Sequence, residues 1–126
     1  MADYKGIKGF LVQTLANNPA ADALSGGVWS SGGNVNEARY SVSGGGTVSA
    51  AWIASGYAPT LPGVSPKHEQ YDGSTWTELA DLDNGRNGAG GAGTTTAALV
   101  FGGYLDPGWS SVTESWNGSS WTELAS

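Results

Sequence analysis

A nine-residue segment occurs twice in the second half of the chain, and this repetition restricts the folds that the chain can adopt. Residues 72–80 read Asp-Gly-Ser-Thr-Trp-Thr-Glu-Leu-Ala, and residues 117–125 read Asn-Gly-Ser-Ser-Trp-Thr-Glu-Leu-Ala. Repetition at a fixed period is typical of supersecondary units that stack, because one such unit cannot bury its apolar face alone. The chain is therefore expected to be an array of similar units.

Tryptophans set the period of this array. Trp29, Trp76 and Trp121 follow one another at intervals of 47 and 45 residues. The shorter second interval places two extra residues in the first copy, in the loop after Tyr57. We expect the periodic positions to serve the scaffold; they are Trp29, Trp76, Trp121, Arg39, Arg86, Gly56, Gly102 and Gly103.

The composition of each unit favours β-strands. The chain has 21 glycines among 126 residues, and no long stretch shows the apolar spacing of a helix. Asp72-Gly73 and Asn117-Gly118 are strong signals for two-residue hairpin loops, since both residue types tolerate positive φ. The second unit divides into four predicted strands, at residues 86–92, 96–104, 112–116 and 120–125.

The sizes of the side chains favour the blades of a β-propeller. Inner strands crowd around a central channel and need small residues, as in the Gly-Ala-Gly-Gly-Ala-Gly segment at 88–93. Outer strands lie farther apart, and Trp76, Trp116 and Trp121 would fill the space between neighbouring sheets. Replacing Trp76 or Trp121 by alanine is then expected to cost about 3–5 kcal/mol of stability.

Two motifs carry a resemblance to a known family. Residues 99–104, Leu-Val-Phe-Gly-Gly-Tyr, resemble the double-glycine strand of kelch repeats. Residues 113–124 are similar to the kelch-like repeats in tail and fibre proteins of tailed phages, and residues 2–10 to the start of such virion proteins. The resemblance implies a β-propeller fold and a structural role in a virion. The first copy departs from the pattern, with Ala54-Ser55-Gly56 in place of Phe-Gly-Gly.

We therefore predict an all-β chain with an N-terminal arm at residues 1–25 and a repeat body at 26–126. The body holds two four-stranded kelch-like blades, at about 37–80 and 86–125, and a spare outer strand near 28–33. Propellers have about 4–8 blades, so oligomerisation would have to complete the ring. Three copies would supply six blades, which makes a homotrimer the expected state; blades that stack without closing are the alternative.

The N-terminal arm is expected either to dock as an extended strand or to be a frayed terminus. Its partners would be other virion proteins, and the apolar residues that would contact them are Ile7, Phe10, Val12 and Leu15.

Charge and cysteine content exclude several classes of function. The formal net charge is −6 and the isoelectric point about 4.3, which argues against nucleic acid or an anionic membrane as partner. No apolar run is long enough for a membrane span, and no secretory signal is evident. Without cysteine, neither disulfides nor thiol chemistry are expected. The expected location is the virion.

The sequence gives little support to catalysis. His68 is the single histidine and is interpreted as a solvated surface residue. Glu78 and Glu123 are repeat equivalents and are assigned to the scaffold rather than to acid–base chemistry. Residues 81–85 are predicted to form a turn rather than a calcium loop, because no glutamate follows at the required place. No enzyme activity, cofactor or metal is expected.

Aromatic residues outside the period are candidates for binding. Trp109 lies in the loop 105–110, and the matching loop 58–64 would lie on the same rim of a propeller. Contact with another subunit is the favoured role for Trp109, with stacking on a sugar ring and simple packing as alternatives. The candidate contact residues are Trp109, Asp106, Tyr104, Tyr57 and Trp52. Arg39 and Arg86 are expected to make equivalent hydrogen bonds between blades.

These observations predict a non-enzymatic virion structural protein, such as a fibre, spike or surface decoration subunit, acting in assembly and in attachment to a host surface glycan. One alternative is a glycan-binding lectin whose subunits complete a β-propeller. A further alternative is a kelch-type scaffold for protein partners. The rim loops differ between the two copies, which argues against a repeated sugar site.

Overall fold

The structure, a computed structural model, describes residues 30–60 and 63–124, and this part of the chain folds into β-strands with no helix. The prediction of an all-β fold is confirmed. Trp29 and the predicted docking residues Ile7, Phe10, Val12 and Leu15 lie outside the described residues. The strands are β1 (Ser43–Thr47), β2 (Ala50–Ala54), β3 (His68–Tyr71), β4 (Trp76–Leu79), β5 (Gly90–Gly93), β6 (Ala98–Phe101), β7 (Tyr104–Leu105), β8 (Gly108–Trp109), β9 (Thr113–Trp116) and β10 (Trp121–Leu124).

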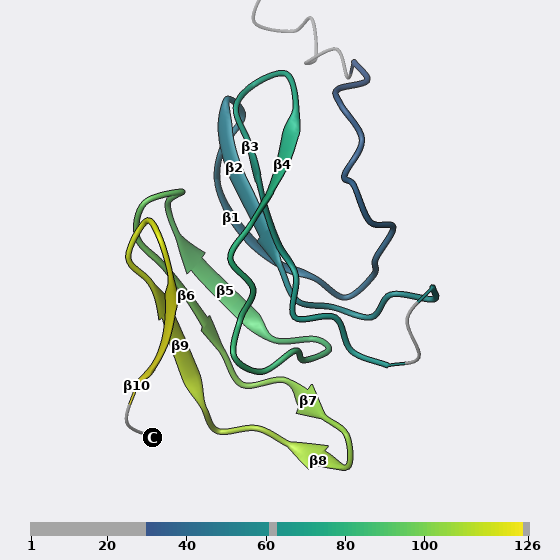
Figure 1. The fold of residues 1–126 in the computed structure, drawn as a ribbon, viewed down its shortest axis with the longest axis vertical. Coiled ribbons are helices and arrows are strands. Elements are labelled where there is room, and N and C mark those ends of the chain that lie inside the picture. Colours follow the sequence, from purple (N-terminus) through teal and green to yellow (C-terminus); the bar gives the residue numbers. More distant parts are fainter. Residues whose placement is uncertain (1–29, 61–62, 125–126) are drawn as a thin grey trace, which may run out of the picture. The chain divides into compact units, whose positions relative to one another are not determined.

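Eight of these strands form two four-stranded antiparallel sheets (Figure 1). The first sheet has the order β1-β2-β3-β4, and the second has the order β5-β6-β9-β10. Both contain the predicted succession of four strands. The hairpin of β7 and β8 was not predicted; it forms within the loop that joins β6 to β9 and is separate from both sheets.

The two sheets are structural repeats at the level of single residues. Gly45 pairs with Trp52 between β1 and β2, and Ala92 pairs with Leu99 between β5 and β6. Each residue of the second pair lies 47 positions after its counterpart in the first pair. The sequence period therefore equals the period of the strand register, and the role of a residue in one sheet can be compared with that of its counterpart in the other.

The outer hairpins differ slightly from the prediction. Asp72 and Asn117 precede the turn instead of forming its first central residue. The Asp72 carboxylate accepts hydrogen bonds from the backbone N–H groups of Ser74 (2.9 Å) and Thr75 (2.8 Å). These bonds lower the pKa of Asp72 to about 2. Gly73 supplies the positive φ of 100°.

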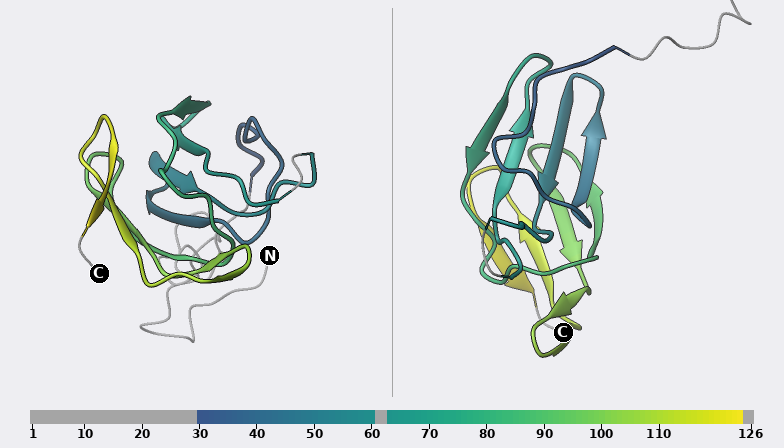
Figure 2. Two further views of the ribbon diagram at one scale, coloured as in Figure 1. Left: turned by 60° about the horizontal axis from the view of Figure 1, so that its bottom comes forward. Right: turned by 90° about the vertical axis from the view of Figure 1, so that its right-hand side faces the viewer.

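The first strands of the two sheets, β1 and β5, lie side by side, as Figure 2 lets the reader follow from two directions. A Cβ atom on Gly45 would stand 2.9 Å from the Gly93 carbonyl oxygen, and one on Gly91 would stand 3.0 Å from the Gly44 nitrogen. Glycine thus allows the two backbones to approach, as was expected for inner strands. Ser43 Oγ also donates to the Ala89 carbonyl oxygen across this boundary (3.0 Å).

The hydrophobic core lies between the two sheets. Trp116 and Trp121 from the second sheet are buried there, as predicted, and Trp52 of the first sheet packs against Trp121 with ring centroids 6.2 Å apart. Trp76, in contrast, is half-buried, because within residues 30–60 and 63–124 no further sheet covers its side of the first sheet. The complete core cluster consists of Trp52, Ala54, Leu82, Ala98, Val100, Trp116 and Trp121.

Each sheet contains one buried ion pair. Arg39 Nη2 lies 2.7 Å from Glu69 Oε1 in the first sheet, and Arg86 pairs with Glu114 in the second; all four side chains are buried. Both arginines also donate to backbone carbonyl groups of their own sheet, among them those of Lys67 and Val112. The two arginines thus make equivalent hydrogen bonds, as expected, but the expectation that these side-chain bonds run between blades is wrong.

The glutamates of these pairs fix the linkers that lead into the sheets. Glu69 accepts from the backbone N–H of Asn36 (2.7 Å), and Glu114 accepts from that of Asp83 (2.8 Å). The segment at 81–85, which was predicted to be a turn, bends at Asp83 and Asn84 and is held by the Glu114 carboxylate. The bond between Ser55 Oγ and the Arg86 carbonyl oxygen (2.6 Å) then links the second linker to the first sheet.

Candidate binding surfaces

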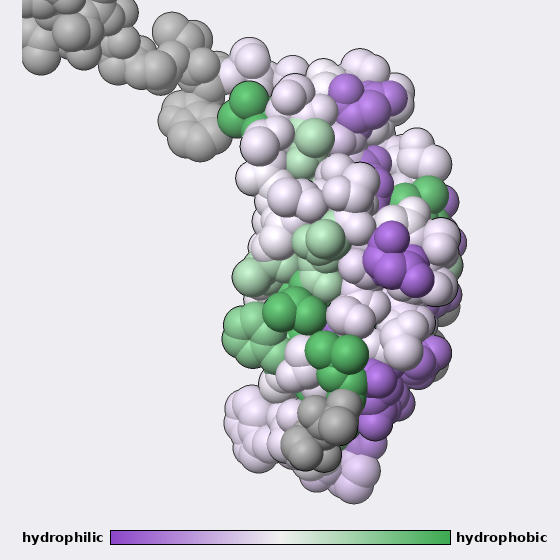
Figure 3. Space-filling model, turned by 90° about the vertical axis from the view of Figure 1, so that its left-hand side faces the viewer, coloured by the Kyte–Doolittle hydropathy of each residue, from purple (hydrophilic) through white to green (hydrophobic). Residues whose placement is uncertain are grey.

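The second sheet leaves an apolar face open, and this face is the strongest candidate for a functional surface. Leu99, Phe101 and Leu124 on this face are 39%, 44% and 41% exposed. Figure 3 shows hydrophobic side chains gathered on the side where the second sheet lies. Exposed apolar side chains that gather on one face mark a candidate interaction surface.

The counterparts of these residues in the first sheet are covered. Leu99 corresponds to Trp52, which is 1% exposed, and Phe101 corresponds to Ala54, which is fully buried. Leu124 corresponds to Leu79, which packs against the core. The second sheet covers this face of the first sheet, whereas within the described part of the chain nothing covers the same face of the second sheet.

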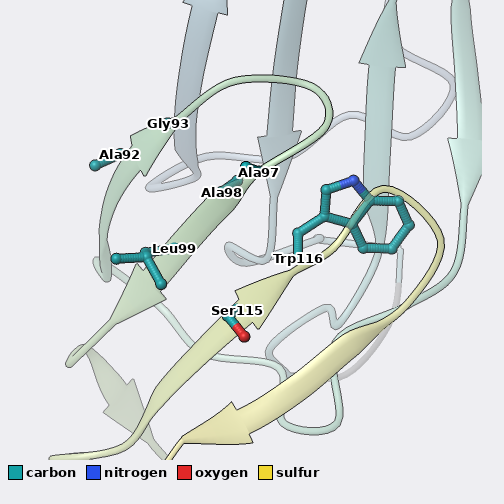
Figure 4. A pocket seen from close by; sticks show the side chains of 7 residues that line it. All are labelled: Ala92, Gly93, Ala97, Ala98, Leu99, Ser115 and Trp116. Carbon is teal, nitrogen blue, oxygen red and sulfur yellow. The ribbon is translucent and has the colours of Figure 1, made fainter.

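A hollow of about 370 Å³ lies on the open face (Figure 4). Leu99 of β6 and Ser115 of β9 pair directly across it. Apart from the Ser115 hydroxyl, its side chains are apolar. The residues that line it are Ala92, Gly93, Ala97, Ala98, Leu99, Ser115 and Trp116.

The first sheet has a corresponding hollow, of about 280 Å³, but there the neighbouring sheet forms one wall. Thr95, in the loop between β5 and β6, reaches across to it. The Thr95 carbonyl oxygen accepts hydrogen bonds from Gln70 Nε2 of the first sheet (2.7 Å) and from Trp116 Nε1 of its own sheet (2.9 Å). Gln70 is the counterpart of Ser115, and the two hollows overlap at three repeat positions: Ala50, Gln70 and Tyr71 of the first sheet correspond to Ala97, Ser115 and Trp116 of the second.

The opposite face of the first sheet is also incompletely covered. Ile53, Tyr71 and Trp76 are half-buried there, whereas their counterparts Val100, Trp116 and Trp121 are buried in the core. Trp76 Nε1 donates to the Gly33 carbonyl oxygen at 3.0 Å. The chain thus presents two different incomplete faces, one on each sheet.

A second candidate surface is a cleft of about 250 Å³ on the rim, between the two loops that follow Tyr57 and Tyr104. Tyr57, Tyr104 and Asp106 line it together with Asn87. Trp109, which is 83% exposed, packs its ring edge-on against Tyr104 with centroids 5.5 Å apart. Four of the five predicted contact residues therefore lie together.

Trp52, the fifth predicted contact residue, does not belong to this group. Its indole is buried between the sheets, and its Nε1 donates to the Gly93 carbonyl oxygen (3.2 Å). The prediction of Trp52 as a ligand or partner contact is wrong, because Trp52 lies on the face of the first sheet that the second sheet covers. Its counterpart in the second sheet, Leu99, lies on the open face.

His68 is a further correction. It was predicted to be solvated, but its side chain is fully buried among Trp52, Trp116 and Trp121. Trp121 Nε1 donates to His68 Nδ1 at 3.3 Å, which requires an unprotonated nitrogen. Burial lowers the pKa of His68 to about 4. The imidazole is a neutral core group without access to a substrate.

Glu78 and Glu123 are exposed and far from any acid–base arrangement. Glu78 forms an ion pair with Lys67 (2.8 Å), and this pairing raises the pKa of the lysine. Within residues 30–60 and 63–124, no cluster of histidine, aspartate or glutamate side chains could hold a metal ion. Nor does this part of the chain contain a helix long and apolar enough to cross a membrane.

Sequence reasoning missed Val48, which is 96% exposed at the tip of the loop between β1 and β2. It also missed Leu99 and Phe101 as surface residues. A signal was present in the differences between the copies: Val48 corresponds to Thr95, and Leu99 to Trp52. A position whose residue type differs between the two copies indicates that the two sheets have different surroundings at that position.

No protein-family model matches the chain, and a search of curated proteins finds no match. Its function has to be argued from the surfaces described above.

Proposed function

We propose that this protein is a non-enzymatic structural subunit of a phage virion, in a fibre, a spike or a surface decoration, and that its two sheets are kelch-like propeller blades. The observation that carries the proposal is the open face of the second sheet, which is the repeat equivalent of a face that the first sheet buries. A sheet with such an open face can pack against a further repeat unit, as neighbouring units do in repeat proteins. The geometry therefore supports a role in assembly.

The number of blades supports assembly from several copies. Two blades are fewer than the roughly 4–8 of closed propellers, and three copies would supply six. Soluble homo-oligomers mostly have closed symmetry, and head-to-tail contacts form a ring where the rotation between copies closes. The N-terminal arm, residues 1–25, would then attach the ring to other virion proteins.

Immunogold labelling tests the virion role. Antibodies raised against the purified protein are applied to intact phage particles from the source that encodes the chain. We expect gold at one defined position on the particle, such as the fibres or the surface. Abundant protein in the lysate together with unlabelled, intact and disrupted particles would refute the role.

A second candidate function, glycan recognition, is favoured by the rim cleft. Tyr57 and Tyr104 offer aromatic rings on which a sugar could stack, and Asp106 and Asn87 offer polar groups for its hydroxyls. The exposed Trp109 beside Tyr104 extends this platform. A lectin function would use this cleft and not the open sheet face.

Binding of the purified protein to polysaccharide from the host cell surface tests this second candidate. If the cleft binds sugar, Trp109→Ala and Asp106→Asn should each weaken binding about tenfold, since a buried stacking or hydrogen-bonding contact is worth about 1–2 kcal/mol. Ser111→Ala, an exposed change outside the cleft lining, is the control. Binding that is unchanged in both cleft variants would exclude the cleft as the site.

A further inference from the structure

We infer that a second copy of this chain docks head to tail on the open face, with its Val48 loop inserted in the apolar hollow that Leu99 and Ser115 line. This inference deepens the proposed assembly role and rests on it. It specifies which two surfaces meet and which residues face one another.

The first support is the equivalence of the two loops. The β1–β2 loop places Val48 where the β5–β6 loop places Thr95, with Gly46 (φ 100°) and Gly93 (φ 110°) at matching positions. Within the chain, the Thr95 loop enters the hollow of the first sheet. By the same geometry, the Val48 loop of a second copy would enter the hollow of the second sheet.

The second support is chemical complementarity. The hollow of the first sheet is lined in part by polar side chains, among them Gln70 and Thr77, and the residue that enters it, Thr95, is also polar. The hollow of the second sheet is lined by Leu99 and small apolar side chains, and the residue that would enter it is apolar, Val48. The tip residue and the lining of the hollow that it would enter are thus both more polar at the first sheet and both apolar at the second.

The third support is the exposure of Val48. A valine that is 96% exposed at a loop tip buries almost none of its apolar surface in the single chain. Removing such an apolar side chain from water favours association. Insertion of the loop in an apolar hollow provides this burial, and the single chain does not.

The remaining contacts follow from the same superposition of repeats. Trp52 packs on Trp121 within the chain, so Leu99 of one copy would pack on Trp76 of the next. The two faces are different, which makes the contact heterologous: each copy contributes one tip and one hollow. This explains why the faces on opposite sides of the chain are both incomplete.

A second copy is favoured over other occupants because both halves of the contact are present on one chain. In the second sheet, the face that packs on the first sheet carries Val100, Trp116 and Trp121. The equivalent face of the first sheet carries Ile53, Tyr71 and Trp76, and it is half-buried. The proposed contact therefore repeats, between copies, an interface that already holds the two sheets together.

Light scattering on a gel-filtration peak, over a concentration series of the full chain, tests the inference. The wild-type protein should associate. Val48→Asp and Leu99→Asp should each raise the dissociation constant at least tenfold, because either change places a carboxylate in the apolar contact. Ser111→Asp adds the same charge in the loop after β8 and should associate like the wild type. Both altered residues are exposed, and circular dichroism confirms folding.

Mixing the two defective variants gives a sharper outcome. The Val48→Asp protein keeps an intact hollow, and the Leu99→Asp protein keeps an intact tip. Together they should form a heterodimer that cannot grow further, although each alone is monomeric. A contact in which each copy offered the same surface would not be rescued by mixing.

Three results would overturn the inference: a wild-type protein that stays monomeric at millimolar concentration, association that both aspartate variants leave unchanged, or defective variants that fail to rescue one another. None of these would refute the virion role, since immunogold labelling decides that separately. Conversely, rescue by mixing together with unlabelled particles would keep the self-docking and remove the virion assignment.

Discussion

At the scale of single residues, positions that are equivalent by sequence differ in environment because, in the described part of the chain, each sheet packs against the other with a different face. Trp76 and Trp121 illustrate this. They occupy the same position in their repeats, yet Trp121 is 6% exposed in the core and Trp76 is half-buried. The equal cost that the sequence predicts for their loss therefore has to be revised.

Trp121→Ala is expected to destabilise the fold by about 3–5 kcal/mol, because it empties a large space in the core. Trp76→Ala should cost roughly half as much, since part of that indole is already in water and one hydrogen bond, to Gly33, is lost. Urea unfolding measures the free energy of unfolding of both variants, each made in the Val48→Asp protein so that self-association does not contribute. Equal losses for the two variants would contradict the burial difference.

Glycine at the boundary of the two sheets gives a second prediction at this scale. Gly45→Ala should destabilise by about 1–3 kcal/mol, because the new Cβ would press on the Gly93 carbonyl oxygen. Gly108→Ala is the matched control: a Cβ there meets no atom within 4 Å and should change stability by less than about 0.5 kcal/mol. Thermal melts of both variants decide the point.

His68 predicts a dependence of stability on pH. Its pKa is about 4 in the fold and 6.5 ordinarily, so the unfolded chain binds a proton at a pH where the folded chain does not. Stability due to this group is therefore full above pH 6.5 and is lost as the pH falls toward 4, by roughly 2 kcal/mol at pH 4.5.

Urea unfolding at pH 7.5 and pH 4.5, followed by tryptophan fluorescence, measures this loss. His68→Gln retains an acceptor for Trp121 and does not titrate, so its stability should fall less over the same range. The carboxylates contribute to both proteins alike. Identical pH dependence in the two would show that His68 does not contribute.

At the scale of elements, each sheet is joined to the linker before it by a buried carboxylate. Glu114 accepts hydrogen bonds from Arg86 and from the linker at Asp83, and Glu69 does the same for Arg39 and Asn36. The linker entering each sheet is thereby fixed by that sheet's third strand.

Glu114→Ala is expected to destabilise the fold by about 3–5 kcal/mol, because it leaves the Arg86 guanidinium buried without its charge partner. Glu123→Ala, on the neighbouring strand β10, removes an exposed glutamate and should cost less than about 0.5 kcal/mol. Chemical denaturation compares the two. A loss below 1 kcal/mol for Glu114→Ala would contradict the structural role of the pair.

At the scale of the whole molecule, the two incomplete faces determine how copies would combine. A heterologous contact either closes into a ring or grows as a filament, depending on the rotation between successive copies. The six blades of a trimer fall within the usual range for propellers.

Native mass spectrometry of the wild-type protein should therefore show one species at three times the 12.8 kDa of a chain. An open series of masses that lengthens with concentration would indicate a filament of stacked units instead of a ring. Val48→Asp should shift the population to the single chain in either case.

The amino-acid sequence by itself determined the period, the four strands of each unit, the all-β class and the glycine-mediated approach of the inner strands. These depend on local turn chemistry and on side-chain size, which can be read along the chain. The sequence also predicted four of the residues around the rim cleft, because equivalent loops of two repeat units lie at the same edge of the structure.

The tertiary structure alone decided which residues are covered. It placed His68 and Trp52 in the core and left Leu99, Phe101 and Val48 exposed, although nothing in their local sequence distinguishes these fates. The physical reason is that burial depends on which sheet stands next to which. Among the described residues, the second sheet covers the Trp52 face of the first sheet, and no sheet covers the equivalent Leu99 face of the second.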